Sequence, residues 1–309
     1  MPGTEGSVRP GRGFGYVFAM PTPTHWQVRG RELSLDRPLV MGIVNVTPDS
    51  FSDGGHYLSP GAALAHAAKL IVEGADILDV GGESTRPQGA TPISVEDELR
   101  RVLPVIRTLA AERPEIILSV DTVKAAVAEA ALAAGAHIVN DVSGMRLDAE
   151  MAAVCAAAEA GVVLMHSRGG VADMATFDHA DYAGDFLDEM LGELRERVYV
   201  AERAGVAREA IAVDPGIGFS KRPEHSLRAL ACLERLAAWG YPVAVGASRK
   251  RFIGELTGEA NPAHRVYGSV GAAVSAYDRG ATILRVHDVA ATRRALDVAA
   301  AIRAAGVDR

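Results

Sequence analysis

The sequence predicts an α/β fold built as a single (β/α)8 TIM barrel, preceded by a short N-terminal extension and a β-hairpin. Two observations support this prediction. Short runs of Val, Ile and Leu recur eight times along the 309 residues, and segments with the apolar spacing of amphipathic helices separate them. Continuous apolar strands alternating with such helices are typical of a parallel sheet buried on both faces. A doubly wound open sheet is the alternative, but no dinucleotide-binding glycine pattern follows the first strand, which disfavours it.

The predicted elements follow one another in a regular order. Residues 1–23 are rich in Gly, Pro and Arg and are expected to be a disordered extension, with Met20 as an alternative start. Residues 24–309 form the barrel domain, which opens with two alternating runs in 24–37 that predict a hairpin. The strands are predicted at 39–46, 76–80, 116–121, 137–141, 161–166, 211–214, 242–247 and 281–286. Segments 61–75 and 97–112 have clear helical spacing, and the connection at 167–182 is long enough to form a flap.

Composition and charge exclude several classes of protein. The formal net charge is −7, and Lys and Arg form no block, which argues against binding to nucleic acid or to an acidic membrane surface. No apolar run reaches the length of a signal-peptide core or a transmembrane helix, so we expect a soluble, cytoplasmic protein. Cys155 and Cys232 lie in helical segments without a metal-binding spacing, and we expect both to be reduced thiols.

Polar residues gather where the predicted strands end. In chain order these ends read NVTPDSFSDGG, DVGGESTRP, SVDT, NDVSG, LMHSRGG, VDPGIGFSK, GASRK and RVHDV. In a parallel barrel all eight carboxyl ends meet at one face, where the active sites of such barrels lie. One or two polar ends would be explained as helix caps, but eight of them predict a functional site at this face.

These strand-end motifs resemble those of the dihydropteroate synthase family of pterin-binding barrels. The resemblance runs from about Leu39 to the C-terminus, and NVTPDSFSDGG, GGESTRP, SRK and RVHDV together are specific for the family. It implies a transferase that joins a dihydropterin-methyl diphosphate to 4-aminobenzoate and releases dihydropteroate and diphosphate. It also implies a homodimer formed through helices late in the chain.

Four strand-end residues match the pterin-binding positions of the family: Asp121, Asn140, Asp214 and Lys250. Carboxylates accept hydrogen bonds from the NH and NH2 groups of a pterin, and an ammonium donates to its carbonyl. The alternative interpretation is that Asp121 and Asp214 cap the helices that follow them. Asp141, beside Asn140, is expected to point away from the site as a helix cap or loop anchor.

Arg285 and His287 lie two residues apart on the last predicted strand, so their side chains project on the same side. A guanidinium binds phosphate through paired hydrogen bonds and an imidazole adds a donor, so the pair is predicted to bind the diphosphate. Asn45 lies where the first strand ends, next to the last strand. Its amide oxygen suits Mg²⁺, the cofactor that the resemblance implies, and Thr85 completes the diphosphate site.

Two loops rich in Gly and small polar residues, TPDSFSDGG and GGESTRPQGA, are predicted to close over the substrates. Asp49 and Asp53 of the first loop are candidates for contact with the metal or with the second loop, and the sequence does not decide between these contacts. The aminobenzoate site implied by the resemblance comprises Phe51, Arg86, Pro87, Phe219 and Ser248, with the Lys250 stem. The amides that open the helix after SRK are predicted to hold the aminobenzoate carboxylate.

The residues expected to carry catalysis are Asn45, Asp121, Lys250, Arg285 and His287. Mg²⁺, Arg285 and His287 would stabilise the departing diphosphate, while Asp121 would favour a cation on the pterin. The amine of 4-aminobenzoate is a weak nucleophile, so positioning matters more than activation. We expect dissociative substitution without a covalent enzyme intermediate.

Three residues depart from the common pattern of the family: Gln88 directly after the proline, Ser220 where glycine is common, and Ser167 where a larger side chain often lines the pterin pocket. Two other functions stay open. One is a catalytically silent pterin-binding paralogue. The other is a methyltetrahydrofolate:corrinoid methyltransferase, whose reaction has no diphosphate and gives no reason for Asn45 with Arg285 and His287.

Overall fold

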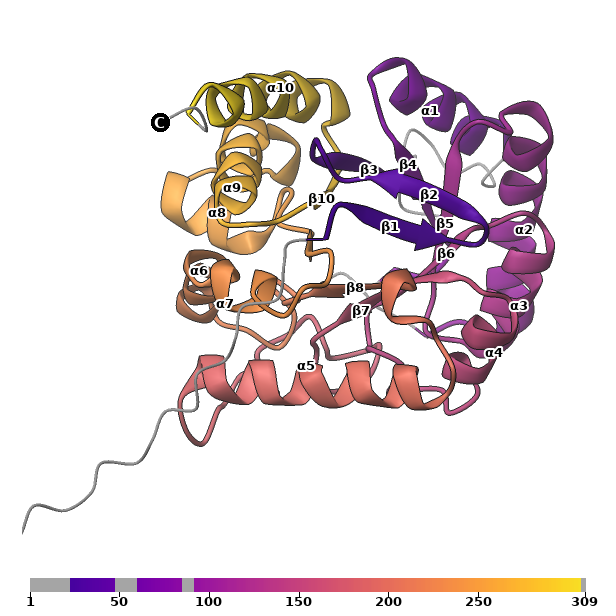
Figure 1. Cartoon of the computed structure of the whole chain (residues 1–309), viewed down its shortest axis with the longest axis horizontal. Coiled ribbons are helices and arrows are strands. Elements are labelled where there is room, and N and C mark those ends of the chain that lie inside the picture. Colours follow the sequence, from indigo (N-terminus) through magenta and orange to yellow (C-terminus); the bar gives the residue numbers. More distant parts are fainter. Residues whose placement is uncertain (1–22, 48–59, 85–91, 307–309) are drawn as a thin grey trace, which may run out of the picture.

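Eight parallel strands form the centre of the molecule and helices surround them (Figure 1). The computed structural model describes residues 23–47, 60–84 and 92–306. The barrel strands are β3 (Leu39–Asn45), β4 (Ile77–Gly81), β5 (Ile117–Asp121), β6 (Ile138–Asp141), β7 (Gly161–Met165), β8 (Ile211–Asp214), β9 (Ala244–Val245) and β10 (Ile283–Val286). They are hydrogen-bonded in the order β8-β7-β6-β5-β4-β3-β10-β9, and a parallel bridge between Val213 and Val243 joins the two ends. The sheet is therefore a closed barrel, as predicted, and not an open doubly wound sheet.

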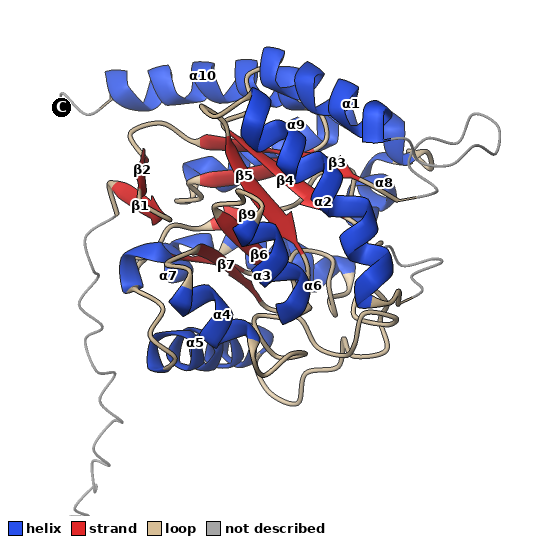
Figure 2. Cartoon of the chain, turned by 90° about the vertical axis from the view of Figure 1, so that its right-hand side faces the viewer, coloured by secondary structure: helices blue, strands red, loops and turns tan. Residues whose placement is uncertain are grey.

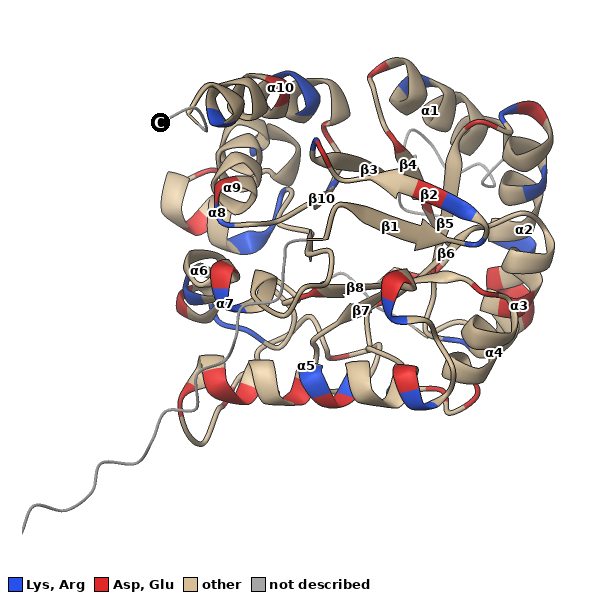
Figure 3. Ribbon diagram, in the orientation of Figure 1, with Lys and Arg blue, Asp and Glu red and all other residues tan. Residues whose placement is uncertain are grey.

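Helices follow the strands and cover the outside of the barrel (Figure 2). They are α1 (Pro60–Val72), α2 (Val95–Glu112), α3 (Ala125–Ala133), α4 (Met151–Ala157), α5 (Phe186–Arg203), α6 (Pro223–Ala231), α7 (Leu233–Ala237), α8 (Arg251–Thr257), α9 (Val266–Asp278) and α10 (Val289–Ala305), with 3-10 turns η2 (Arg208–Ala210) and η3 (Pro262–His264). Short polar side chains cap the longest ones: Ser94 Oγ accepts from the Asp97 amide at 3.1 Å, and Asp185 Oδ1 from the Leu187 amide at 2.9 Å. None of the helices in the described ranges combines the length and the apolar character needed to cross a bilayer. Acidic and basic residues are interspersed along α5 (Figure 3).

The predicted hairpin closes the amino-terminal end of the barrel. Its strands β1 (His25–Val28) and β2 (Arg31–Ser34) pair antiparallel, and Figure 1 shows them in front of the barrel strands. Trp26 is fully buried, and its Nε1 donates to the Ala210 carbonyl at 2.9 Å. Trp26 and Val28 pack against the first residues of the barrel strands. A Cβ at Gly161 would lie 2.5 Å from Val28 Cγ1, so only glycine permits this approach. The hairpin therefore does not cover the carboxyl end of the barrel, where the site was predicted.

Two predictions about elements were wrong in extent. The strand expected at 242–247 is only Ala244–Val245: Pro242 has no N–H to donate, and the Val243 amide donates to the Thr282 hydroxyl at 3.1 Å and not to a strand carbonyl. The connection expected at 167–182 spans residues 166–185, between β7 and α5. It does not stand free as a flap: its Met174 and Ala175 pack against apolar side chains at the barrel mouth, among them Phe219. Both cysteines are free thiols, as expected.

Candidate active site

A buried cluster of charged and amide groups lies at the carboxyl ends of four barrel strands. Arg285 of β10 donates from Nε to Asp79 Oδ2 and from Nη2 to Asp121 Oδ2, both at 2.6 Å. Asn140 Nδ2 donates to the same Asp79 oxygen at 3.0 Å. The Asp79 side chain is fully buried, whereas those of Asp121 and Arg285 are 15% and 22% exposed. The Arg285 guanidinium therefore donates to two carboxylates. The three residues predicted from the sequence, Asp121, Asn140 and Arg285, are grouped with Asp79, which was not predicted.

Because Asp121 shares the Arg285 guanidinium with Asp79, its negative charge is only partly neutralised. Burial, opposed by Arg285 and assisted by the neighbouring Asp79 carboxylate, raises the pKa of Asp121 to about 7. The two carboxylates in turn raise the pKa of the Arg285 guanidinium above its ordinary value, against the effect of burial. Asp121 can thus change its charge near neutral pH while Arg285 stays cationic.

Asp214 at the end of β8 serves the turn that follows it and the site together. Its Oδ1 accepts a hydrogen bond from the Gly216 amide at 2.6 Å within this turn, whereas the next helix, α6, begins only at Pro223, so the interpretation of Asp214 as a helix cap is wrong. Gly216 has φ +69°, and a Cβ there would lie 1.9 Å from the His166 carbonyl oxygen, so no other residue fits. Burial raises the pKa of Asp214 to about 6, and the charges of Lys250, Lys221 and Arg285 oppose this rise.

The Lys250 ammonium lies over the Phe219 ring. Lys250 Nζ is 3.8 Å from the centroid of the Phe219 ring, which is a cation–π contact. Burial and the nearby Arg285 lower the pKa of Lys250 to about 7, while Asp214 and Asp121 oppose the change. Helix α8 begins directly after Lys250, as predicted for the segment that follows SRK. An aromatic wall and an ammonium are therefore available side by side.

His287 and Asn45 flank this cluster at the ends of β10 and β3. His287 Nδ1 lies 3.1 Å from Ser248 Oγ, and the His287 amide donates to the same hydroxyl at 3.2 Å. The Asn45 side chain is half-buried and makes no hydrogen bond to the described residues. No group of three or more His, Cys, Asp or Glu in the described ranges could hold a metal ion. A single open amide oxygen without a protein cage fits Mg²⁺, which takes most of its ligands from water and phosphate.

Several predicted residues lie outside the described residues, so their placement stays a prediction. They are Thr85, Arg86 and Pro87 of the second loop with Gln88, and Phe51, Asp49 and Asp53 of the first. The two loops predicted to close over the substrates are thus untested.

Two of the unusual residues and Asp141 have clear structural roles. Asp141 accepts hydrogen bonds from the Ser143 amide at 2.7 Å and the Met145 amide at 3.0 Å, which confirms that it anchors a loop. Ser167 is buried and donates to the Val142 carbonyl at 2.7 Å. Ser220 has φ +48°, and its hydroxyl accepts from the Arg168 amide at 2.8 Å and donates to the Arg168 carbonyl at 2.7 Å. A glycine there would relax the backbone but would lose both bonds.

Sequence reasoning missed two buried residues at this end of the barrel. Asp79 interrupts the apolar run ILDVG, and a charged residue inside a strand buried on both faces was the available signal. Lys221 closes the VDPGIGFSK segment and is only 1% exposed, although nothing in the local sequence indicates burial.

Comparisons with known proteins agree with this geometry. A family model described as "Pterin binding enzyme" matches residues 41–287. The dihydropteroate synthase of Synechocystis is 44% identical, with 86% of this chain and 90% of the relative covered, and that of Escherichia coli is 44% identical, with 87% and 93% covered.

Solved structures give the same result. The Xanthomonas albilineans dihydropteroate synthase with 4-aminobenzoic acid superimposes with a TM-score of 0.84 at 50% identity, covering 92% of this chain and 99% of that one. The same protein in complex with 7,8-dihydropteroate gives a TM-score of 0.81 at 48% identity, covering 91% and 99%. By sequence and by structure, the chain belongs to the pterin-binding enzyme family and, within it, to the dihydropteroate synthases.

Proposed function

We propose that this chain condenses (7,8-dihydropterin-6-yl)methyl diphosphate with 4-aminobenzoate to give 7,8-dihydropteroate and diphosphate. The observation that supports this activity most is the buried cluster of Asp79, Asp121, Asn140 and Arg285 at the carboxyl face of the barrel. Such a cluster provides largely buried acceptors and a fixed cation, as a planar heterocycle with several N–H groups requires. The relatives that carry the same activity in their names match nearly the whole barrel.

In this proposal Asp214 and Asn140 bind the edge of the pterin ring and Lys250 donates to its carbonyl. Asp214 accepts from ring N–H groups only when ionised, and the cations around it favour that state. Asp121 lies closer to Arg285 and faces the carbon that loses diphosphate. Its negative charge would stabilise the cation that forms there.

The diphosphate leaves toward Arg285, His287 and Asn45. Arg285 is held by Asp79 and Asp121, so it meets the leaving group in a fixed orientation and needs no rearrangement. Asn45 would supply one oxygen ligand to Mg²⁺, which neutralises developing charge on the diphosphate when it is bound. Ser248 orients the His287 ring through its hydroxyl. The carbon–oxygen bond breaks first and its electron pair leaves with the diphosphate; the amine nitrogen then bonds to the cation and gives up one proton to solvent.

The 4-aminobenzoate ring is proposed to stack beside Phe219 and the Lys250 stem, with Ser248 near its carboxylate. The Phe219–Lys250 contact already forms one wall of such a slot. Phe51, Arg86, Pro87 and Thr85 would complete the slot and the diphosphate site from the two loops. The amine is a weak nucleophile, so this confinement contributes more than any general base.

The test is diphosphate release from the purified protein given the pterin diphosphate, with and without 4-aminobenzoate and Mg²⁺. The proposal expects metal-dependent release together with dihydropteroate formation, and loss of both in Arg285→Met and Asn45→Ala. Lys69→Met, on the outer face of α1 with a side chain 69% exposed, is the control and should keep full activity. Tight pterin binding without turnover would instead identify a silent paralogue.

We also propose that the chain forms a homodimer through its last helices. Apolar side chains on α8, α9 and α10 are exposed: Leu256 by 63%, Tyr267 by 91%, Val298 by 61% and Ile302 by 69%. A face of this kind is unfavourable in water unless a partner covers it. Sedimentation should give a dimer for the wild type and a monomer for the double variant Val298→Asp and Ile302→Asp. Val72→Asp is the control: this exposed valine lies on α1, away from the last helices, and the variant should remain a dimer.

A further inference from the structure

Lys221 is a fully buried lysine to which the proposed reaction assigns no role. Its ammonium nitrogen lies 2.7 Å from His166 Nδ1, 3.0 Å from the Phe219 carbonyl oxygen and 3.3 Å from the His166 carbonyl oxygen. Lysine is rarely buried without a carboxylate partner, and none of these three partners is a carboxylate. Burial lowers the pKa of Lys221 to about 7, and the charges of Asp214 and Glu193 oppose this change. Burying an ammonium is unfavourable, so Lys221 is expected to have a function that offsets this cost.

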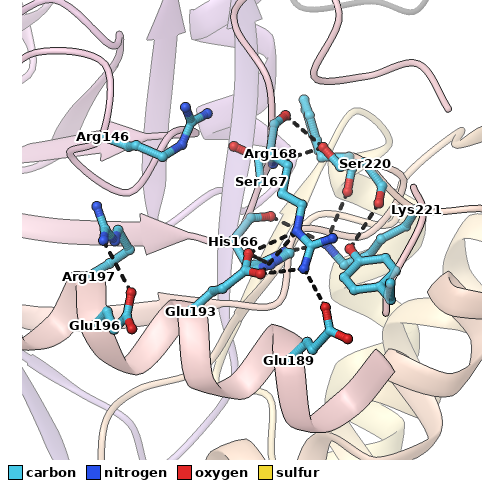
Figure 4. A network of polar contacts seen from close by, with 12 residues as sticks. Arg146, His166, Ser167, Arg168, Glu189, Glu193, Glu196, Arg197, Ser220 and Lys221 are labelled. Carbon is cyan, nitrogen blue, oxygen red and sulfur yellow. Dashed lines mark hydrogen bonds and ion pairs between the residues drawn. The ribbon is translucent and has the colours of Figure 1, made fainter. Parts of the chain in front are cut away.

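The neighbours of Lys221 fix the protonation state of His166. Below its pKa of about 7 Lys221 is an ammonium and can only donate, so His166 Nδ1 accepts there, and its Nε2 carries the hydrogen that faces Glu193 Oε2 at 3.0 Å. Burial and Lys221 lower the pKa of His166 to about 4, so the ring is neutral at neutral pH. Glu193 is held ionised by Arg168, which donates from Nε at 3.0 Å (Figure 4). The chain of donors therefore runs one way, from Lys221 through His166 to α5.

At the Lys221 end, this series of hydrogen bonds leads to the proposed pterin and aminobenzoate sites. Lys221 holds the Phe219 carbonyl, and the Phe219 ring faces Lys250. Lys221 and Asp214 also interact electrostatically, and Lys221 acts on Asp214 together with Lys250 and Arg285. On the Lys221 side the remaining facing charges are Glu193, Arg168 and Lys250. His166 joins the two residues directly, since its amide donates to the Asp214 carbonyl at 2.9 Å and its own carbonyl accepts from Lys221 at 3.3 Å.

We propose that Lys221 is a positioning residue for pterin recognition, whose buried ammonium, held by neutral His166, keeps Asp214 ionised and fixes the Phe219 wall. This inference rests on the proposed role of Asp214 as acceptor for the pterin ring. The lysine would touch neither substrate. It acts through the carboxylate and through the carbonyl that it binds.

The experiment measures binding of a non-reactive pterin, 6-hydroxymethylpterin, by titration calorimetry from pH 5.5 to 8.5 in the wild type and in Lys221→Met. Without the ammonium, Asp214 should take up a proton at higher pH. For a displacement of one pH unit the variant should bind about fivefold more weakly at pH 6, with the difference vanishing by pH 8.5. Lys69→Met removes an exposed ammonium and should leave the profile unchanged.

Each outcome has one meaning. A wild type that binds no pterin would refute the proposed function itself. A variant weakened equally at every pH, or not at all, would refute the role of Lys221 alone, since a purely structural residue gives no pH-dependent difference. If Lys221→Met does not fold, ¹⁵N spectra of the lysine ammonium replace it. Asp214→Asn should then lower the titration midpoint of the buried lysine, and an unchanged midpoint would overturn the inference.

Discussion

Replacing Arg285 by Met should destabilise the protein by an amount that depends on pH in a defined direction. The substitution removes the guanidinium that bonds to both Asp79 and Asp121 at 2.6 Å and leaves two carboxylates in the barrel with no cation between them. Breaking a buried ion pair by removing one partner lowers the free energy of unfolding by about 3–5 kcal/mol. We expect a loss of this size at pH 8.

The pH dependence follows from Asp121. Its pKa in the folded protein is raised from 3.8 to about 7, so its contribution to stability is complete below the unfolded value and is lost as the pH rises through about 7. Arg285 opposes that rise, so Arg285→Met moves the folded pKa higher still. Each further unit adds about 1.4 kcal/mol to the loss at high pH. For a change of one unit the variant carboxyl is still half protonated at pH 8, so the difference between variant and wild type should be about 1 kcal/mol smaller at pH 5 than at pH 8.

Urea unfolding followed by circular dichroism at pH 5 and pH 8 measures this difference, with the slope checked for constancy between variants. Arg293→Met is the matched control, because Arg293 also bonds to a largely buried aspartate, Asp76, at 3.2 Å, but away from the site. The control should be destabilised and yet still bind pterin. A loss for Arg285→Met that is equal at the two pH values, or larger at pH 5, would refute the reasoning that Arg285 keeps Asp121 ionised.

Four further predictions concern other parts of the molecule. Trp26→Ala, which empties the closed end of the barrel, should lower the free energy of unfolding by about 3–5 kcal/mol in urea while the folded fraction keeps its turnover number. Pterin affinity should be complete above the Asp214 pKa of about 6 and fall as the pH drops through it, because a protonated carboxyl no longer accepts from the ring; calorimetry across pH 5–8 measures this. Chelation of Mg²⁺ should abolish diphosphate release without moving the urea midpoint, and Asn45→Ala should raise the Mg²⁺ concentration required at least tenfold. Ser220→Gly should lower the free energy of unfolding by about 1 kcal/mol, since it loses two hydrogen bonds of about 1 kcal/mol each and regains about 1 kcal/mol of backbone strain.

The fold was predictable because each barrel strand repeats the same signal. A run such as VVLM or ILSV is almost entirely apolar, is followed at once by a polar residue, His166 or Asp121, and leads into a segment with helical spacing. The repeat places Asp121, Asn140 and Asp214 at one face before any contact is known. The prediction was less accurate for β9, which is shorter than expected because Pro242 has no N–H group to donate.

The parts of the site that could not be predicted depend on partners far away in the chain. A strand buried on both faces has no alternation to tell whether Asp79 points inward, and its partner Arg285 lies 206 residues away. Lys221 resembles any lysine at the end of a polar loop, and only His166, 55 residues earlier, makes it a buried cation. The role of Arg285 toward diphosphate stays a prediction, because the sequence indicated a phosphate ligand and the structure adds two carboxylates that hold it.

The hairpin at the closed end also constrains the order in which this chain can fold. Trp26 is synthesised before all eight barrel strands, yet its hydrogen-bond partner is Ala210, 184 residues later, and its apolar neighbours include Ile283 of the last strand. Contacts of such separation form only after the intervening chain has been organised, because the entropy of closing so long a loop must be recovered from structure already present. The hairpin leaves the ribosome before the barrel strands but is thus expected to be among the last elements to pack, so the burial of Trp26 would mark the completion of the barrel.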